Sequence, residues 1–89
     1  MERQSVRFEG GVQGVGFRAT ARSIASQHKV TGWVRNEADG SVQLEVQGPR
    51  LEVQGFLATI RNRLSAFIQR ELVETIKPIE GERGFEIRR

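Results

Sequence analysis

The spacing of the apolar residues changes several times along this 89-residue sequence, and the order of these changes restricts the fold most. Residues 4–9 alternate polar and apolar side chains, which is typical of a half-buried strand. A glycine-rich stretch follows at 10–16, and from Phe17 onward the core-facing positions recur every three to four residues, which predicts a helix. The positions on that face of the helix are Ala21, Ile24, Ala25 and His28.

The next segment has the pattern of two paired strands. Val30–Arg35 is strand-like, and period-two alternation returns in residues 42–46. Between them, Glu37-Ala38-Asp39-Gly40 contains Asp-Gly, a dipeptide typical of tight turns. Residues 30–47 are therefore predicted to form a β-hairpin.

A second helix and two further strands complete the pattern. Gly48-Pro49 ends the hairpin, and proline suits the first turn of the helix that follows. Helical spacing continues as far as residues 67–68, so the pattern leaves the end of this helix open. Residues 71–77 are predicted to form a strand, and residues 85–87 a short last one. The apolar positions of the second helix are Val53, Phe56, Leu57, Ile60 and Leu64.

This order of elements, strand–helix–strand–strand–helix–strand with one terminal strand, is that of a split βαβ, ferredoxin-like plan. We expect an α+β sandwich in which two helices cover one face of a mainly antiparallel sheet of four to five strands. The length suits a single domain, taken here as residues 1–89.

Composition narrows the class of protein. Hydrophobic residues make up 37% of the chain and charged residues 28%, which is typical of a globular protein and excludes disorder. No apolar run is long enough to span a membrane, and no apolar signal segment is visible. The absence of cysteine excludes disulfides, thiolate metal sites and a cysteine nucleophile. We expect a cytoplasmic monomer without a membrane partner.

The net charge of +3 leaves two kinds of anionic partner open, nucleic acid and small anions. The basic residues are spread along the chain rather than clustered, as expected for a solvated surface. Their combined field mildly favours an anionic substrate.

The sharpest motif is Val12-Gln13-Gly14-Val15-Gly16-Phe17-Arg18, between the first strand and the first helix. Two glycines let the backbone adopt conformations closed to other residues and approach a ligand closely. Successive N–H groups can then form a concave nest at the positive end of the helix. Arg18 adds a planar fork that matches phosphate oxygens. The run predicts a phosphate cradle, although a tight strand-to-helix connection with an incidental arginine would look similar.

Two related glycine motifs do not fit. A P-loop requires Gly-Lys-Ser/Thr after its glycines, and no lysine follows here. Gly14, Gly16 and Ala19 loosely match a dinucleotide fingerprint, with Glu37 near the expected distance for a ribose-binding acid. A doubly wound domain needs more βαβ units than 89 residues can supply.

A second constellation, Gly32-Trp33-Val34-Arg35-Asn36, lies at the end of the second predicted strand. Asn36 precedes the hairpin turn, and supporting that turn is the commoner role of asparagine there. Its carboxamide can also donate and accept hydrogen bonds together, so it could hold a water molecule beside a phosphate.

These two motifs, followed by Asp39-Gly40 and ending in Phe85-Glu86-Ile87, resemble the signature of the acylphosphatase family over nearly the whole chain. The resemblance implies hydrolysis of a small acyl phosphate, with no metal and no cofactor. It also implies that the amides of residues 13–18 and the Arg18 side chain bind the phosphoryl group. Asn36 would orient the attacking water.

The chain departs from the family pattern in three places. Gly11 replaces a usual basic residue, and the Gly-Pro that usually precedes the fourth strand is missing. His28-Lys29 replaces an apolar residue and glycine, so either Lys29 is left-handed or the first helix ends differently. His28 itself is expected on the core-facing side of that helix, in a structural role.

Two other functions share this topology. RNA-binding modules stack bases on aromatic residues of the middle strands. The third predicted strand offers no aromatic residue and the first offers only Phe8, which argues against that function. A non-catalytic or regulatory acylphosphatase-like domain, of the kind attached to larger hydrogenase-maturation proteins, is the other alternative.

Overall fold

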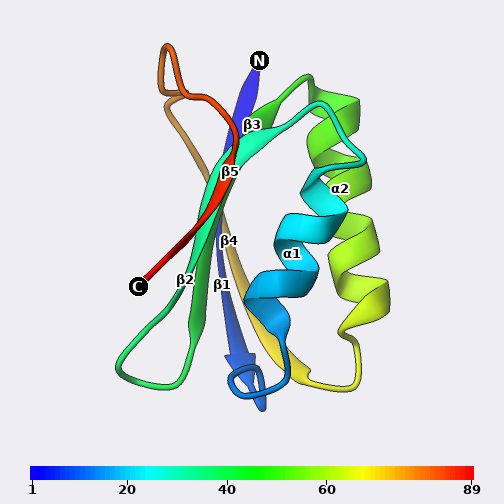
Figure 1. Cartoon of the computed structure of the whole chain (residues 1–89), viewed down its shortest axis with the longest axis vertical. Coiled ribbons are helices and arrows are strands. Elements are labelled where there is room, and N and C mark those ends of the chain that lie inside the picture. The colour runs from blue at the N-terminus through cyan, green and yellow to red at the C-terminus, as the bar shows by residue number, and fades with distance from the viewer.

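A computed structural model describes all residues, 1–89, and contains two helices and one five-stranded sheet. The strands lie in the order β4-β1-β3-β2-β5; all neighbours are antiparallel except β2 and β5. Both helices cover the same face of the sheet (Figure 1), so the predicted ferredoxin-like fold is confirmed. The elements are β1 (Glu2–Gly10), α1 (Phe17–Ala25), β2 (Thr31–Asn36), β3 (Val42–Gly48), α2 (Arg50–Arg63), β4 (Ile68–Ile76) and β5 (Phe85–Arg88).

The core lies between the two helices and the face of the sheet that they cover. The alternation of side chains along the strands explains which residues it contains. Val6 and Phe8 of β1 are completely buried, as are the apolar positions of β3. Because side chains alternate across a strand, every second residue of β1 and β3 points to the helices. Apolar positions of both helices, including Ile24 and Phe56, complete one cluster of 16 buried residues.

The opposite face of the middle strands is polar. Three cross-strand pairs on β1 and β3, Arg3–Gln47, Ser5–Glu45 and Arg7–Gln43, lie there side by side. None of these residues is aromatic. On β2, Trp33 is only 6% exposed, because the guanidinium groups of Arg35 and Arg88 lie over its ring. The face therefore lacks the exposed aromatic platform that an RNA-binding sheet requires.

The first helix is shorter than its apolar pattern predicts. It ends at Ala25. The N–H groups of Gln27 and His28 then donate to carbonyl oxygens three residues earlier, so the α-helix does not continue for another turn. His28 is therefore in the connection rather than on the helix, where its ring packs edge-on against Phe56 at 6.3 Å. No residue other than glycine has a positive φ, so Lys29 is not left-handed. Its N–H donates to the Glu52 carboxylate at 2.9 Å.

The second helix also ends before its periodic pattern does. Leu64 is buried and follows the last helical residue, Arg63. Phe67, by contrast, is 36% exposed, and Ile68 already belongs to β4, where the prediction began the strand at residue 71. Ile68 pairs with Gly10, and a Cβ at Gly10 would lie 2.6 Å from the Phe67 carbonyl oxygen. Glycine thus permits the close approach that starts β4. Neither helix has the length and apolarity needed to cross a membrane.

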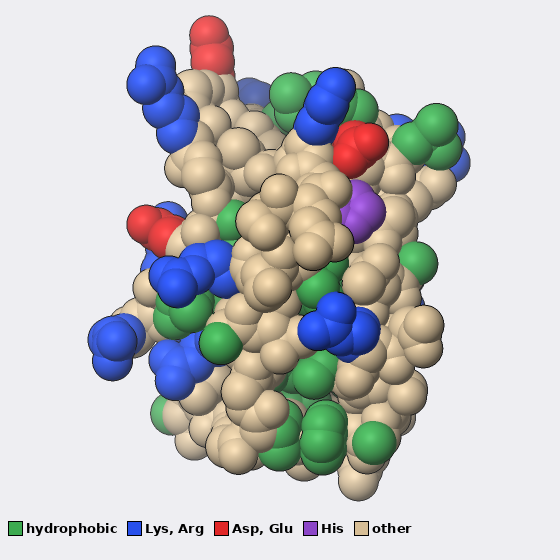
Figure 2. Space-filling model, turned by 45° about the vertical axis from the view of Figure 1, so that its right-hand side comes forward, with side chains coloured by type: hydrophobic (Ala, Val, Ile, Leu, Met, Phe, Trp, Pro, Cys, Tyr) green, Lys and Arg blue, Asp and Glu red, His purple; other side chains and the backbone are tan.

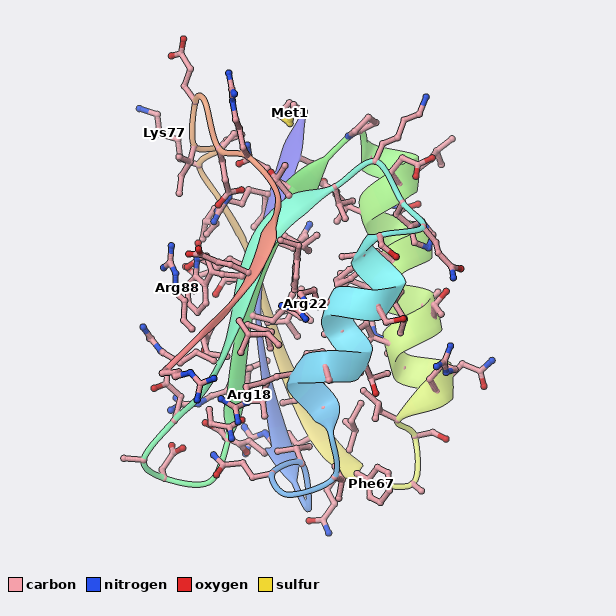
Figure 3. All side chains as sticks on the ribbon, in the orientation of Figure 1. Met1, Arg18, Arg22, Phe67, Lys77 and Arg88 are labelled. Atoms are coloured by element: carbon pink, nitrogen blue, oxygen red, sulfur yellow. The ribbon has the colours of Figure 1, made fainter.

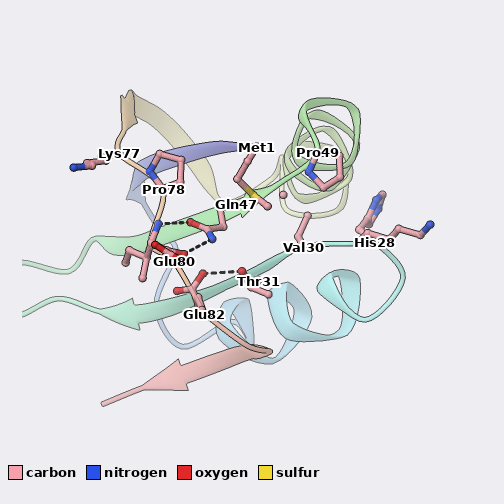
Figure 4. Close-up of a pocket in the computed structure, with 14 residues that line it drawn as sticks. Met1, His28, Val30, Thr31, Gln47, Pro49, Lys77, Pro78, Glu80 and Glu82 are labelled. Carbon is pink, nitrogen blue, oxygen red and sulfur yellow. Dashed lines mark hydrogen bonds between the residues drawn. The ribbon is translucent and has the colours of Figure 1, made fainter.

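The connection from β4 to β5 is held to the sheet by a buried arginine. Arg3 is completely buried and donates to Glu82 at 2.8 and 3.1 Å, to Glu45 at 2.9 Å and to Gln47 at 2.9 Å. Gln47 also exchanges two hydrogen bonds with the main chain of Ile79 (Figure 4).

The network shifts the pKa values of its charged members. Burial alone would raise the pKa of Glu82, but hydrogen bonds from Arg3 and Thr31 outweigh it and hold this pKa below 4.5. Burial likewise opposes the charge on Arg3, yet its two carboxylate partners raise its pKa. Because the Glu82 pKa is lower in the folded chain, its carboxylate stabilises the fold above about pH 4.5, and that contribution is lost at lower pH.

We expect Glu82→Gln to lower the free energy of unfolding at pH 7 by about 1–3 kcal/mol, the scale of hydrogen bonds to a charged group. The difference from the unsubstituted protein should shrink as the pH falls below about 4.5, because the lowered pKa of Glu82 is approached and its charge is progressively lost. Urea denaturation across this pH range measures the difference. Glu86→Gln is the control: its carboxylate is 63% exposed and pairs with Arg88, so less than about 1 kcal/mol is expected. Equal losses in the two variants would contradict the anchoring role.

Candidate active site

Two glycines shape the loop between β1 and α1. Gly14 has φ 78° and Gly16 has φ 77°, both in the left-handed region. A Cβ at either position would meet no atom within 4 Å, so conformation rather than space favours glycine there. Gly16 is the N-cap of α1, and no side chain caps the helix. The loop therefore turns directly into a helix whose first N–H groups are open.

The amides of this loop have no partner within the protein. Residues 14–18 donate no backbone hydrogen bond to any main-chain or side-chain acceptor. The first helical N–H groups have no acceptor four residues earlier in a helix, and they carry its partial positive charge. Unpaired amides gathered at a helix N-terminus form an anion site.

A cavity of about 230 Å³ adjoins these amides and brings the two predicted catalytic side chains together. Arg18 reaches it from the first turn of α1, and Asn36 from the last residue of β2. Arg18 lies beside the start of α1, at the end of the molecule opposite Met1 and Lys77 (Figure 3). The residues around the cavity are Val12, Gly14, Gly16, Phe17, Arg18, Ala19, Asn36, Ile87 and Arg89, none of them acidic.

Buried neighbours fix the position of Arg18. Phe17 is 2% exposed, and its ring lies 5.0 Å from that of Phe8 in the core. Val12, at the other end of the loop, is completely buried. Arg18 itself is half-buried and forms no hydrogen bond or ion pair with the protein. The backbone at Arg18 is thus held in place, and its guanidinium is left free for a ligand.

The side chains of the remaining predicted ligands do not all face the cavity. Gln13 donates from Nε2 to the carbonyl oxygens of Glu37 at 2.8 Å and Ser41 at 2.9 Å, which ties the loop to the β2–β3 turn. Val15 packs partly against the core. Neither residue lines the cavity, so at these two positions only the backbone N–H remains as a predicted ligand.

The acidic residues of the neighbouring β2–β3 turn are paired away from the cavity. Glu37 binds Arg35 at 2.9 Å, and Asp39 binds Arg7 at 2.7 Å. Hydrogen bonds from the side chain and the N–H of Ser41 lower the pKa of Asp39. No group of three or more His, Cys, Asp or Glu side chains is arranged to hold a metal ion.

Sequence reasoning missed two residues of the cavity, Ile87 and Arg89. Both come from the end of β5, which pairs in parallel with β2. The carboxyl ends of neighbouring parallel strands lie at the same end of the sheet, so Asn36 and Arg89 both lie at that end. The signal was the Phe85, Ile87 alternation, but it does not show which strand β5 joins.

A larger cavity of about 790 Å³ lies at the opposite end of the molecule, near Met1 and Pro49 (Figure 4). Its inward polar groups already bind one another: Thr31 donates to Glu82 at 2.7 Å, and Gln47 is occupied by Ile79. No buried side-chain nitrogen or oxygen lacks a partner anywhere in the chain. The smaller cavity is therefore the better candidate.

The fold and this cavity define a ferredoxin-like α+β protein whose cavity, at the start of its first helix, offers unpaired amides and a free guanidinium. More particularly, the chain belongs to the acylphosphatase family, whose model matches residues 4–87. It is 39% identical over 89 residues to an acylphosphatase of Salinibacter ruber, covering 99% of this chain and 94% of that one. The acylphosphatase of Methanospirillum hungatei is 40% identical, with 100% and 99% covered. A crystal structure of the Bacillus subtilis acylphosphatase superimposes with a TM-score of 0.89 at 30% identity, covering all of both chains.

We expect Gly16→Ala to weaken both the fold and phosphate binding. An alanine at this left-handed position costs about 1–2 kcal/mol, or forces the loop to turn its amides away. Urea denaturation and an NMR titration with inorganic phosphate measure the two effects. Gly11→Ala is the matched control, because Gly11 has no positive φ and open space around its Cβ position. Unchanged phosphate affinity in Gly16→Ala would show that the loop does not form the cradle.

Proposed function

We propose that this chain hydrolyses acyl phosphates, with the amides of residues 13–18 and Arg18 binding the phosphoryl group and Asn36 orienting the attacking water. Membership of the acylphosphatase family supports the reaction. The observation that carries the site is the meeting of unpaired loop amides, an unpaired guanidinium and a carboxamide in one cavity without acid. A regulatory, non-catalytic role is not favoured, since the family match spans the chain.

The reaction exchanges one bond to phosphorus for another. Water oxygen attacks phosphorus while the bond between phosphorus and the acyl oxygen breaks, and the electron pair of that bond leaves with the carboxylate. The products are a carboxylate, inorganic phosphate and a proton released to solvent. Attack and departure lie in line on opposite sides of phosphorus.

The chemistry matches the groups that the cavity offers. A carboxylate is a good leaving group, so it needs no strong general acid. The transition state chiefly requires stabilisation of charge on the phosphoryl oxygens and alignment of the water. Donors fixed in a loop and at a helix N-terminus provide the first. Asn36, at the end of β2, provides the second, because its carbonyl oxygen can accept from water while its amide group donates.

Several wider expectations remain predictions. We propose that residues 1–89 form one domain, since the single core cluster includes residues of β1 to β3 and both helices, and apolar residues of β4 and β5 pack against it. We further propose a cytoplasmic monomer that acts without metal or cofactor on a small acyl phosphate and binds no nucleic acid. The polar middle of the open sheet face supports the last point.

We expect Arg18→Gln to reduce kcat/KM for benzoyl phosphate by roughly 100-fold or more, since this charge contacts the phosphoryl group in both the ground and transition states. Inhibition by inorganic phosphate should weaken in parallel. Release of phosphate is measured with chelator present. Arg22→Gln is the control, because Arg22 lies one turn later on α1, is exposed and forms no ion pair. If both variants lose the same activity, the loss reflects net charge and not a contact.

For Asn36→Ala we expect kcat to fall by roughly 100- to 1,000-fold, by analogy with loss of one preorganised donor. Inhibition by phosphate should stay nearly unchanged, because the loop and Arg18 remain. Asn62→Ala, at an exposed position on α2, should retain full activity. A folded and fully active Asn36→Ala protein would remove the water-positioning role. Loss of phosphate binding in Asn36→Ala with retention in Arg18→Gln would reverse the two assignments.

A further inference from the structure

Arg89 lines the same cavity as Arg18. Arg89 lines that cavity and forms no hydrogen bond or ion pair with any protein group. Its neighbour Arg88 differs on both counts: Arg88 lies over Trp33 and donates to Glu86 at 2.7 Å. The two consecutive arginines therefore differ: Arg88 interacts with other side chains, and Arg89 has no partner in the protein.

The alternation of β5 explains this difference. Ile87 packs against the core on the helix face, whereas Arg88 lies over Trp33 on the opposite face. The next side chain returns to the face of Ile87, so Arg89 faces α1 and the cavity.

The register of β2 and β5 places Arg89 beside Asn36. Val34 pairs with Ile87, and Arg35 pairs with Arg88. One step further along the two parallel strands brings Asn36 level with Arg89 on the same side of the sheet. Arg18 approaches the cavity from α1, so the two free guanidinium groups come from different layers of the fold.

This position decides which part of a substrate Arg89 can reach. If Asn36 holds the water, the acyl group leaves on the far side of phosphorus, because attack and departure are in line. A guanidinium next to Asn36 is then on the side of the attacking water, from which it can reach the equatorial phosphoryl oxygens but not the acyl group. Figure 2 shows several basic side chains along its left edge, with acidic side chains beside some of them. The cavity itself contains no acidic residue to neutralise Arg89.

We propose that Arg89 is a second phosphoryl-binding residue, which acts with Arg18 to hold the phosphoryl oxygens from the β5 side. The proposal rests on the function assigned above, but it concerns recognition of the phosphoryl group and not of the acyl group. Arg89 is exposed, so its contribution is that of a partly screened ion pair.

The test is the affinity for inorganic phosphate, measured by NMR titration of the amides of residues 14–18. We expect Arg89→Gln to raise the dissociation constant about two- to fivefold. Arg89→Lys should recover part of the loss, and the difference should fade near 0.5 M salt, where the Debye length is only a few ångströms. Arg22→Gln, which removes the same charge from an exposed site outside the cavity, should bind phosphate like the unsubstituted protein.

Hydrolysis separates this proposal from the alternatives. Benzoyl phosphate and 3-carboxybenzoyl phosphate share the phosphoryl group and differ by one charge on the acyl half. Arg89→Gln should raise KM for both by a similar factor. Wild-type phosphate affinity in Arg89→Gln, an equal loss in Arg22→Gln, or an effect confined to the carboxylated substrate would each overturn the proposal. Phosphate binding that depends on Arg89 in a protein that hydrolyses neither substrate would instead overturn only the proposed function.

Discussion

The hydrogen bonds of the buried Arg3 hold the segment that joins the two edge strands of the sheet. β4 and β5 are consecutive in the chain, yet they occupy opposite edges, so residues 77–84 must pass the ends of three strands. Each of those strands holds this segment by a side chain: Arg3 and Thr31 bind Glu82, and Gln47 binds Ile79. Because a completely buried guanidinium without partners would be very costly, the network fixes the path. The path delivers β5 to β2, and with it Ile87 and Arg89 to the cavity.

Most of the fold could be predicted because its elements are amphipathic and have clear ends. The change from period two to helical spacing at Phe17 locates β1 and α1, and Asp39-Gly40 locates the hairpin turn. The errors lie where apolar residues continue a pattern past the end of an element. His28 and Ile68 both occupy positions of the correct period, but tertiary contacts with Phe56 and Gly10 place them in a connection and a strand. Periodicity alone does not predict those tertiary contacts.

The candidate site could be predicted in part, for a related reason. Gly14, Gly16 and Arg18 are close in sequence, so their local conformation already suggests a cradle, and Asn36 follows from the resemblance to a family. Arg89 could not be predicted, because its place depends on the pairing of β5 with a strand some fifty residues earlier. The choice of that strand depends on the Arg3 network, which joins residues far apart in the sequence.

Ion pairs with arginines hold the acidic side chains near the candidate site away from its cavity. Most carboxylates near the open face and the β2–β3 turn are bound by an arginine: Glu37 by Arg35, Asp39 by Arg7 and Glu86 by Arg88. Those arginines are thereby neutralised, and so are the acids that would otherwise repel an anionic ligand. Arg18 and Arg89 remain unpaired, and both line the cavity. Other basic residues, among them Arg22 and Arg50, are also unpaired, but they do not line this cavity, which adjoins the open amides of the loop. Pairing elsewhere in the fold thus leaves this end of the molecule with two unpaired guanidinium groups, as the proposed phosphate site requires.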